Sequence, residues 1–392
     1  MGIETAVNFD DLRRAAKRRL PKIAFDFIEG GVDGEGGLPH NERAFAKHRL
    51  VPRYLIDAMK PDQSTTLFGR TYAHPFGIAP TGGGGLFGAG ADLMLAQAAR
   101  AADIPFIISG ASTATIEEVA AIAPAHSWYQ LYNARDRAIA DDMVMRTERA
   151  GLSTLVLTVD VPGHSNRERN RRNGFARPMK PSLYAKVEAL AHPGWLAEYY
   201  SSPGLTTSNW VKYAPPGATP NEVLDFMSGQ HPCAFTWDDV IRIRKLWPRT
   251  LVLKGIMHPA DATRAATLGV DGLMISNHGA RQLDRAPSPL EVLPAIRDAV
   301  GDKVTVMFDS GIRRGADIIT ALSLGAKFAF VGRWTLYGVA AGGQAGATHA
   351  VDMIRKEVAF VMTQMGAPDI AALGPDFLMW DNDADRMRNR RP

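Results

Sequence analysis

The sequence predicts an α/β protein folded as a closed (β/α)₈ barrel, with a helical N-terminal extension and a long insertion after the fourth strand. Eight short apolar segments recur along the 392 residues, and stretches of helical periodicity alternate with them. Near-continuous apolar strands indicate a parallel sheet that helices cover on both faces. Eight such units over roughly 260 residues match a TIM barrel of about 250 residues better than an open sheet.

The expected strands and helices of the barrel alternate in regular order. The strands are Phe76–Ala79, Pro105–Ser109, Ser127–Leu131, Thr154–Asp160, Leu251–Lys254, Gly272–Ser276, Val304–Asp309 and Phe328–Gly332. The helices are Asp92–Ala102, Ile116–Ile122, Ala138–Ala150, Trp237–Trp247, Ala260–Leu268 and Ala316–Leu324. Gly151, Gly269 and Gly325 are expected to end three of these helices, because glycine readily adopts the left-handed conformation of a helix terminus.

Residues 1–392 are expected to form one domain. Residues 1–70 form an N-terminal cap with short helices at Asp10–Arg19 and Pro21–Glu29, where Pro21 suits a first helical turn. Residues 76–340 form the barrel, and residues 341–392 a C-terminal helix and tail. The insertion, residues 168–235, is dense in proline, tryptophan and tyrosine. A loop of this length within a compact domain is typically functional.

The composition is that of a soluble globular protein, with 46% hydrophobic residues, 22% charged residues and a formal net charge of +4. The charges are interspersed, which argues against a nucleic-acid partner. Cys233 is the single cysteine, so an intrachain disulfide and a cysteine metal cluster are excluded. We expect no metal and a reducing, cytoplasmic location. No signal peptide or transmembrane segment is expected, since Pro75, Pro80 and several glycines interrupt the longest uncharged stretch.

The residues that follow the predicted strands are unusually polar. In this architecture the active site forms at the C-terminal ends of the strands. The burial of many polar groups there requires a polar ligand to satisfy them. The positions concerned are Thr81, Ser109, Gln130, Tyr132, Thr158, Asp160, Lys254, Ser276 to Arg281, Asp309 to Arg313, Gly332 and Arg333.

The turns after strands seven and eight predict a phosphate site. They read Asp309 to Gly315 and Gly332-Arg333, in which glycines admit backbone amides close to an anion and arginines supply charge. The alternative is that two Gly-Arg turns merely cap helices. Gly83 to Gly88 also matches the dinucleotide motif G-x-G-x-x-G, but the acid required at the end of the next strand is absent, so this match is weak.

His278 is the candidate catalytic base. A lone histidine at a strand end is more often structural, but Arg281 lies three residues on and Asp160 enters the same barrel mouth from strand four. A carboxylate beside an imidazole raises its basicity and stabilises the imidazolium that forms on proton abstraction. The functional interpretation is therefore favoured.

At these residues the chain resembles the FMN-dependent 2-hydroxy acid oxidase and dehydrogenase family, which includes glycolate oxidase and lactate and mandelate dehydrogenases. The resemblance covers Asp10 to about Pro375. It rests on four motifs in the family's order and spacing, namely Lys254-Gly255, Ser276–Asp284, Asp309–Arg314 and Gly332-Arg333. The pattern is most similar to that of mandelate dehydrogenase.

The resemblance implies FMN as cofactor and a role for each matching residue. His278 takes a proton, Asp160 steadies it, Tyr132 faces the substrate hydroxyl, and Arg281 and Arg167 face the carboxylate. Lys254 stabilises the negative charge that builds on the reduced flavin. The flavin and ribityl are contacted by Pro80, Thr81, Gly82, Ser109, Gln130, Thr158, Lys254 and Ser276, and the ribityl and phosphate by Asp309, Gly311, Arg313, Gly332 and Arg333.

We expect the substrate pocket to be lined by Phe27, Ala111, Tyr132, Arg167, His278 and Arg281. At this pocket the sequence departs from the family pattern at three positions. Phe27 stands where many relatives have a tyrosine, and without the hydroxyl it cannot donate a hydrogen bond to a carboxylate; an equally good interpretation is that Phe27 only packs in the core. Ala111 replaces the large tryptophan of glycolate oxidases, and Gly82 replaces alanine, so the pocket should be wide. We expect a bulky or aromatic substrate such as mandelate. Oxidation of an amine or modified peptide, and a non-catalytic barrel that binds a phosphorylated ligand, are the alternatives.

The insertion resembles that of membrane-associated relatives. It carries an aromatic-rich stretch that is expected at a membrane interface, with a soluble active-site lid as the alternative. We therefore expect a cytoplasmic protein with peripheral contact to the inner face of the membrane, and a quinone as electron acceptor with oxygen as the alternative. The resemblance to the family also implies a homotetramer. The stretch contains Leu183, Tyr184, Val187, Leu190, Trp195, Leu196 and Tyr199.

Overall fold

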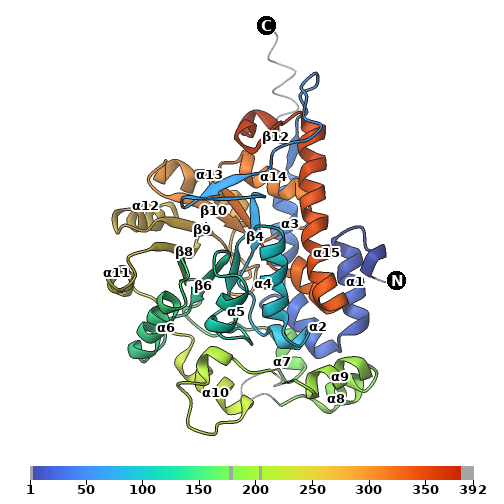
Figure 1. Ribbon diagram of the computed structural model, residues 1–392, viewed down its shortest axis with the longest axis vertical. Helices are drawn as coiled ribbons and strands as arrows, with labels where there is room; N and C mark the ends of the chain where they lie inside the picture. Colours follow the sequence, from blue (N-terminus) through green and yellow to red (C-terminus); the bar gives the residue numbers. More distant parts are fainter. Residues whose placement is uncertain (1–2, 176–179, 203–204, 381–392) are drawn as a thin grey trace.

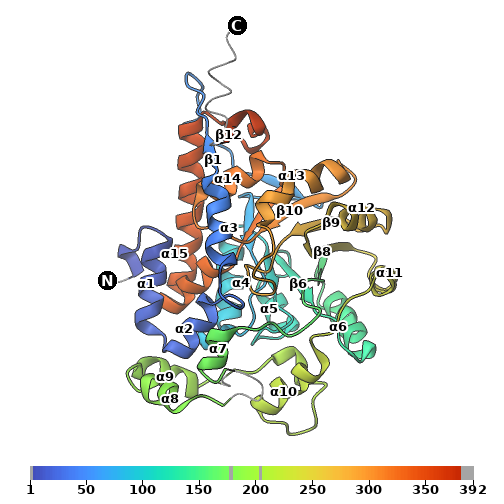
Figure 2. The same ribbon diagram turned by 180° about the vertical axis from the view of Figure 1, so that it is seen from behind.

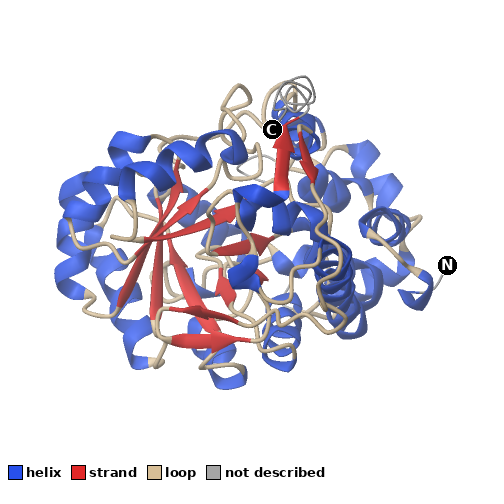
Figure 3. Ribbon diagram, turned by 90° about the horizontal axis from the view of Figure 1, so that it is seen from above, coloured by secondary structure: helices blue, strands red, loops and turns tan. Residues whose placement is uncertain are grey.

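The structure is a computed structural model that describes residues 3–175, 180–202 and 205–380. Its centre is a closed barrel of eight parallel strands in the order β10-β11-β4-β5-β6-β7-β8-β9 (Figures 1 and 3). The predicted fold class is therefore confirmed, and each predicted strand is present. The strands are β4 (Phe76–Ile78), β5 (Phe106–Ile108), β6 (Ser127–Leu131), β7 (Thr154–Thr158), β8 (Thr250–Ile256), β9 (Gly272–Ile275), β10 (Thr305–Asp309) and β11 (Phe328–Val331).

Large apolar side chains fill the barrel interior. Trp128, Met274 and Phe330 belong to an inner cluster that is separate from the larger core between the strands and the helices. The hairpin of β2 (Thr65–Leu67) and β3 (Arg70–Tyr72) joins this inner cluster, and its Phe68 packs close to Gly272, the first residue of β9. The N-terminal end of the barrel is thereby closed, so the C-terminal end is left for a site.

The outer helices match the six predicted ones to within two residues at either end. Gly151, Gly269 and Gly325 all have positive φ, as expected of residues that end helices. One further helix after β9 was not predicted. The helices around the barrel are α4 (Ala91–Ala101), α5 (Ile116–Ile122), α6 (Arg137–Arg149), α11 (Trp237–Leu246), α12 (Pro259–Thr267), α13 (Pro289–Val300), α14 (Gly315–Ser323) and α15 (Arg333–Met365).

The N-terminal extension packs along one side of the barrel. It contains α1 (Phe9–Arg19), α2 (Lys22–Glu29) and α3 (Gly37–Ala46), and α1 lies against α15 in both side views (Figures 1 and 2). Pro21 is the N-cap of α2, one residue before the first turn in which it was predicted. The long helix α15 crosses residue 340 and is kinked at Gly342 and Gly343.

The chain closes on itself through a small sheet. Strand β1 (His48–Leu50) pairs with β12 (Leu378–Trp380) in antiparallel fashion. The predicted tail beyond residue 380 lies outside the described residues. The short 3-10 helices of the chain are η1 (Ile3–Thr5), η2 (Gly84–Leu86), η3 (Ser208–Trp210), η4 (Ile370–Ala372) and η5 (Pro375–Phe377).

The insertion lies beneath the barrel mouth as a set of short helices (Figure 1). Two buried tryptophans fasten it to the barrel: Trp195 Nε1 donates to the carbonyl of Leu86, and Trp210 Nε1 donates to that of Gly110. Among the described helices, none is long and apolar enough to cross a membrane. The insertion comprises α7 (Glu168–Arg172), α8 (Leu183–Ala189), α9 (Pro193–Tyr200), η3 and α10 (Pro220–Gln230).

Candidate active site

A cavity of about 580 Å³ opens at the C-terminal ends of the barrel strands. It gathers most of the predicted site residues from distant parts of the chain. Four others, Ser109, Gln130, Asp160 and Ser276, do not line it. The predicted residues that line the cavity are Phe27, Pro80, Thr81, Gly82, Ala111, Tyr132, Thr158, Arg167, Lys254, His278, Arg281, Asp309, Gly311, Arg313, Gly332 and Arg333.

His278 and Asp160 form a hydrogen-bonded pair at the cavity. Nδ1 of His278 lies 3.0 Å from Oδ1 of Asp160. Because an ionised carboxylate can only accept, Nδ1 carries the hydrogen and Nε2 is left as the basic nitrogen. His278 has a φ of 58° and Ala280 one of 59°. Left-handed backbone at non-glycine residues is uncommon and is concentrated at functional sites.

The charge states of this pair favour a neutral base. Burial lowers the pKa of His278 below its ordinary value of 6.5, and Asp160 opposes this effect without reversing it. Asp160 therefore does raise the pKa of His278, as expected, but desolvation lowers this pKa by more. Burial raises the pKa of Asp160, whereas His278 and Lys254 lower it, and the net direction is downward. The site therefore holds a neutral imidazole beside an ionised carboxylate.

Lys254 is a buried ammonium held by two neighbours. Its Nζ lies 3.0 Å from Oδ2 of Asp309 and donates to Oγ of Ser276 over 2.8 Å. Burial lowers the pKa of Lys254, but Asp309 and Asp160 raise it by more, so the net pKa is raised. A positive charge is therefore fixed beneath the cavity at neutral pH.

Arg281 is oriented by backbone carbonyls at the end of α2. Its Nη1 donates to the carbonyl oxygens of Phe27, Ile28 and Gly30 at 2.8, 3.2 and 2.9 Å. Burial lowers the pKa of Arg281 well below 12.5, and the nearby cations Arg167 and Arg333 lower it further. Within the described ranges, no carboxylate of the chain forms an ion pair with Arg281. One edge of this guanidinium is thus fixed, and its charge is uncompensated.

Arg167 is the second uncompensated cation of the cavity. Its Nε donates to the carbonyl of Arg281 and its Nη2 to Oε1 of Gln282, at 3.4 and 3.2 Å. Burial lowers the pKa of Arg167. It likewise has no carboxylate partner in the part of the chain that the structure describes. Two like charges in a desolvated cavity repel each other, so an anionic ligand between them is strongly favoured.

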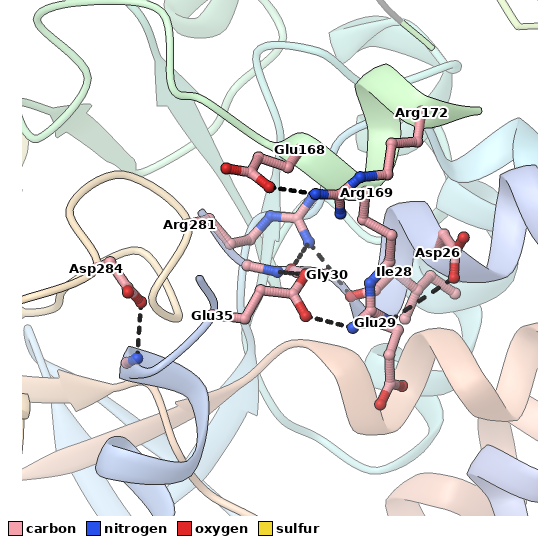
Figure 4. A network of polar contacts seen from close by, with 12 residues as sticks. Asp26, Ile28, Glu29, Gly30, Glu35, Glu168, Arg169, Arg172, Arg281 and Asp284 are labelled. Atoms are coloured by element: carbon pink, nitrogen blue, oxygen red, sulfur yellow. Dashed lines mark hydrogen bonds and ion pairs between the residues drawn. The ribbon is translucent and has the colours of Figure 1, made fainter. Parts of the chain in front are cut away.

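A polar network holds the turn that orients Arg281 (Figure 4). Arg169 of α7 lies 3.7 Å from Asp26 and forms an ion pair with Glu35. Oε1 of Glu35 in turn accepts a hydrogen bond from the backbone amide of Gly31 at 3.0 Å. The network therefore joins α7, which follows Arg167, to the turn whose carbonyls bind Arg281.

The two arginines predicted to bind phosphate both line the cavity, but in different settings. Arg333 donates to the carbonyls of Ile28 at 2.9 Å and Gly30 at 3.0 Å, and burial lowers its pKa to about 10. Arg313 instead pairs with Glu42 at 2.9 Å, and its guanidinium lies 4.6 Å from the ring centre of Phe9. Glu42 and Phe9 belong to the N-terminal extension, of which only Phe27 was predicted at the site.

Several buried polar atoms at the strand ends have no partner in the described chain. They are Oγ1 of Thr81, Nε2 of Gln130 and Oγ1 of Thr158. Unpaired buried donors and acceptors are costly, so such groups at the strand ends favour a ligand that pairs with them. A flavin offers ring nitrogens and carbonyl oxygens at its edge, so these groups fit it well.

The small residues and Phe27 shape the opposite wall. A Cβ at Gly82 would lie only 2.9 Å from the Cβ of Ala111, so the two loops touch at this point. Phe27 packs at 4.8 Å from Phe175 and 6.1 Å from Phe87, between ring centres. Its ring also faces the Arg281 guanidinium at 5.2 Å. Both interpretations of Phe27 thus hold: it packs in an aromatic cluster, and it borders the cavity.

Sequence reasoning missed a group of cavity residues from the insertion. They cannot be read from periodicity, because their position depends on how Trp195 and Trp210 fasten the insertion to the barrel. The only signal was the length and aromatic content of the segment. These residues are Phe175, Leu205, Thr207, Leu224, Met227, Ser228 and His231.

The mouth of the barrel combines a His–Asp pair and a buried lysine with unpaired polar groups that suit a cofactor and with two uncompensated arginines. This combination defines a flavin-dependent oxidoreductase of acidic substrates. The chain belongs to the FMN-dependent dehydrogenase family, whose family model matches residues 16–380. It is an FMN-dependent 2-hydroxy acid oxidoreductase.

Relatives with known names support this assignment. The (S)-mandelate dehydrogenase of Pseudomonas putida is 38% identical over 95% of this chain and 93% of its own length. An L-lactate dehydrogenase of Caulobacter vibrioides is 36% identical, over 94% of this chain and 96% of that protein. A crystal structure of the monotopic membrane protein (S)-mandelate dehydrogenase superposes with a TM-score of 0.92 at 37% identity, covering 96% of this chain and all of that one.

Proposed function

We propose that the protein oxidises a bulky or aromatic 2-hydroxy acid, with mandelate as the representative substrate, to the 2-oxo acid. The observation that carries this proposal is the pair of uncompensated arginines, Arg281 and Arg167, beside the His278–Asp160 pair. A carboxylate bound between the arginines brings the adjacent hydroxyl-bearing carbon to the histidine. The proposal is supported by the named relatives, two of which act on mandelate or lactate by their names.

Each residue has a defined part in the proposed reaction. Arg281 and Arg167 bind the substrate carboxylate, and Tyr132 holds the substrate hydroxyl. Nε2 of His278 accepts a proton from the substrate, and Asp160 stabilises the imidazolium that forms. Lys254 compensates negative charge near the cofactor. When bound, FMN supplies the acceptor for the two electrons that leave the substrate carbon.

The proposed FMN site follows the strand ends around the barrel. Lys254 and the unpaired groups of Thr81, Gln130 and Thr158 serve the ring system. The cations Arg313 and Arg333 lie on the β10 and β11 loops, where barrels of this class commonly bind phosphate. The remaining residues proposed to hold the cofactor are Pro80, Gly82, Ser109, Ser276, Asp309, Gly311 and Gly332.

The substrate side chain is proposed to lie against an apolar wall. Aromatic and aliphatic side chains from α2, the β4 loop and the insertion border the cavity, and Ala111 leaves room beside them. Such a wall favours a phenyl group over the hydrogen or methyl group of glycolate or lactate. The wall consists of Phe27, Phe87, Phe175, Leu205, Leu224 and Met227.

The test is anaerobic stopped-flow reduction of the bound flavin by both enantiomers of mandelate, by lactate and by glycolate. We expect one enantiomer of mandelate to give the highest kcat/KM, by about 10-fold or more over lactate. Fastest reduction by glycolate would overturn the proposed substrate class. Reduction by amines but by none of the hydroxy acids would overturn the proposed reaction.

We further propose that a quinone takes the electrons and that α8 binds the membrane surface. Leu183, Tyr184, Val187 and Leu190 are exposed along one face of α8 and its C-cap. The expectation for Trp195 was wrong, because this side chain is buried, whereas Leu196 and Tyr199 are partly buried and pack against the core. One relative is described as a monotopic membrane protein, which supports the proposal.

Two measurements test the acceptor and the membrane contact. With mandelate as donor, a soluble quinone should support turnover and oxygen should not, so rapid peroxide production in air would contradict the proposal. The double variant L183E/V187E should abolish sedimentation with anionic lipid vesicles. F360E removes an equally exposed apolar side chain of α15 and should leave sedimentation unchanged. A homotetramer stays a prediction, to be checked by light scattering.

A further inference from the structure

Two polar side chains of the insertion line the cavity with a polar atom unpaired. Thr207 is only 2% exposed, and its Oγ1 has no hydrogen-bond partner among the described residues. Nδ1 of His231 is likewise buried without a partner in the described ranges. Neither of these two atoms takes part in the reaction or in the cofactor site proposed above. Unpaired buried polar atoms at a ligand cavity indicate a polar group on the ligand.

Both side chains lie on the side of the cavity assigned to the substrate. Thr207 precedes η3, which is held on the β5 loop because Ser208 donates its backbone amide to the carbonyl of Ser112 at 3.1 Å. Ala111 is part of the same loop. The ring of His231 lies 4.3 Å from that of Tyr132, which follows β6. In the closed strand order, β6 stands directly across the barrel from β10, whose loop carries Arg313.

The chemistry of His231 specifies what it can bind. Burial lowers the pKa of His231 to about 4, with His278, His164 and Arg167 adding to this effect, so its imidazole is neutral at physiological pH. Nδ1 is a ring nitrogen without a partner in the described chain. In a neutral imidazole this nitrogen is either a donor or an acceptor, and a hydroxyl group can pair with it in both cases.

We propose that Thr207 and His231 form a polar subsite for a hydroxyl group on the substrate's side chain. The preferred substrate is then an aromatic 2-hydroxy acid whose ring carries a hydroxyl that pairs with Nδ1 of His231 or with the Thr207 hydroxyl. His164, Ser165, Asn170 and Ser228 are further polar side chains of the lining, but among the described residues of the insertion only Thr207 and His231 line the cavity with a buried polar atom that lacks a partner. The proposal rests on the proposed function and deepens it.

The experiment compares kcat/KM for flavin reduction by mandelate, 4-methylmandelate and the 2-, 3- and 4-hydroxymandelates. The best hydroxy isomer should exceed both mandelate and the methyl compound by about 10-fold or more, because unfilled polar sites reject analogues that lack the polar group. The near-isosteric variant T207V should reduce this ratio several-fold. T206V is the matched control, since Thr206 is an adjacent buried threonine that does not line the cavity, and its ratio should not change.

A second variant and a binding measurement separate recognition from folding and turnover. H231F keeps an aromatic ring against Tyr132 but removes Nδ1, and it should reduce the same ratio. Dissociation constants of phenylglyoxylate and its ring-hydroxylated forms, followed by the flavin absorption band, should show the same preference without turnover. Reduction by mandelate with no preference for any hydroxy isomer would overturn the subsite alone, as would equal effects of T207V and T206V. Failure of every hydroxy acid to reduce the flavin would overturn the proposed function as well.

Discussion

His278 and Asp160, 118 positions apart in the chain, are joined by a contact of 3.0 Å between Nδ1 and Oδ1 at the mouth of the barrel. The contact fixes the hydrogen on Nδ1 and leaves Nε2 free to accept a proton. It also keeps a carboxylate in place to stabilise the imidazolium. The base therefore depends on two loops of the barrel, those after β7 and β9.

Replacement of His278 by asparagine should give a folded, yellow and inactive protein. Flavin reduction by mandelate should slow by about 10²-fold to 10⁴-fold, the range expected when a general base is removed. A visible spectrum checks that FMN is retained, and stopped-flow absorbance gives the rate. His126 offers a matched control, because its Nε2 lies 2.8 Å from Asp103 in a second His–Asp pair outside the cavity. H126N should reduce flavin at the normal rate, and equal losses in the two variants would contradict the assignment.

The pH profile should report a base with a low pKa. Burial lowers the pKa of His278 below 6.5, so the neutral form persists under mildly acidic conditions. As a result kcat/KM should stay level from pH 8 to 6.5 and fall only at lower pH, where the imidazole becomes protonated. D160N removes the charge that raises this pKa, and should move the acid limb to still lower pH while it slows the reaction. An acid limb centred above pH 7 would contradict this account.

The barrel and most of its site were predictable because their signals are local. Each strand is a short apolar run, and most of the predicted site residues lie at the end of one or soon after it, so chain order alone places these side chains at one end of the barrel. Helix α13 was not predicted because it contains Pro289 and Pro294, and proline normally argues against a helix. Pro289 is in fact at its N-terminus, where Ser288 and Glu291 form a capping box.

The remaining parts of the site depend on contacts between distant segments. The pairing of Arg313 with Glu42, and the carbonyls that orient Arg281, come from the N-terminal extension. Thr207 and His231 reach the cavity only because the insertion is fastened by Trp195 and Trp210. No periodicity or spacing encodes such contacts. The same holds for the net pKa of His278, which is decided by the depth of burial rather than by its neighbour in the motif.

Replacement of Arg281 by lysine should impair substrate binding. The guanidinium donates from Nη1 to three backbone carbonyls and still presents other N–H groups to a carboxylate. A lysine ammonium lacks the planar fork and cannot do both in one fixed geometry. We expect KM for mandelate to rise by about 10-fold to 100-fold, measured in steady state with an artificial acceptor. An unchanged KM would remove Arg281 from the carboxylate site.

Arg169 should act as a positioning residue for substrate binding, although it does not line the cavity. It connects Asp26 and Glu35, and Glu35 holds the amide of Gly31 next to the carbonyl that binds Arg281 (Figure 4). R169M should release this turn and raise KM for mandelate by about 10-fold, with a smaller effect on kcat, since the change acts on binding.

The control for this prediction is R172M on the same helix. Arg172 is exposed and pairs only with Glu168 of its own helix among the described residues, so KM should be unchanged. The double variant R169M/E35Q should be no worse than R169M, because both residues act through one contact. A merely structural role would lower the thermal midpoint of R169M and leave KM normal in the folded fraction. That result, or a fall in kcat at constant KM, would show that the Arg169–Glu35 contact does not serve Arg281.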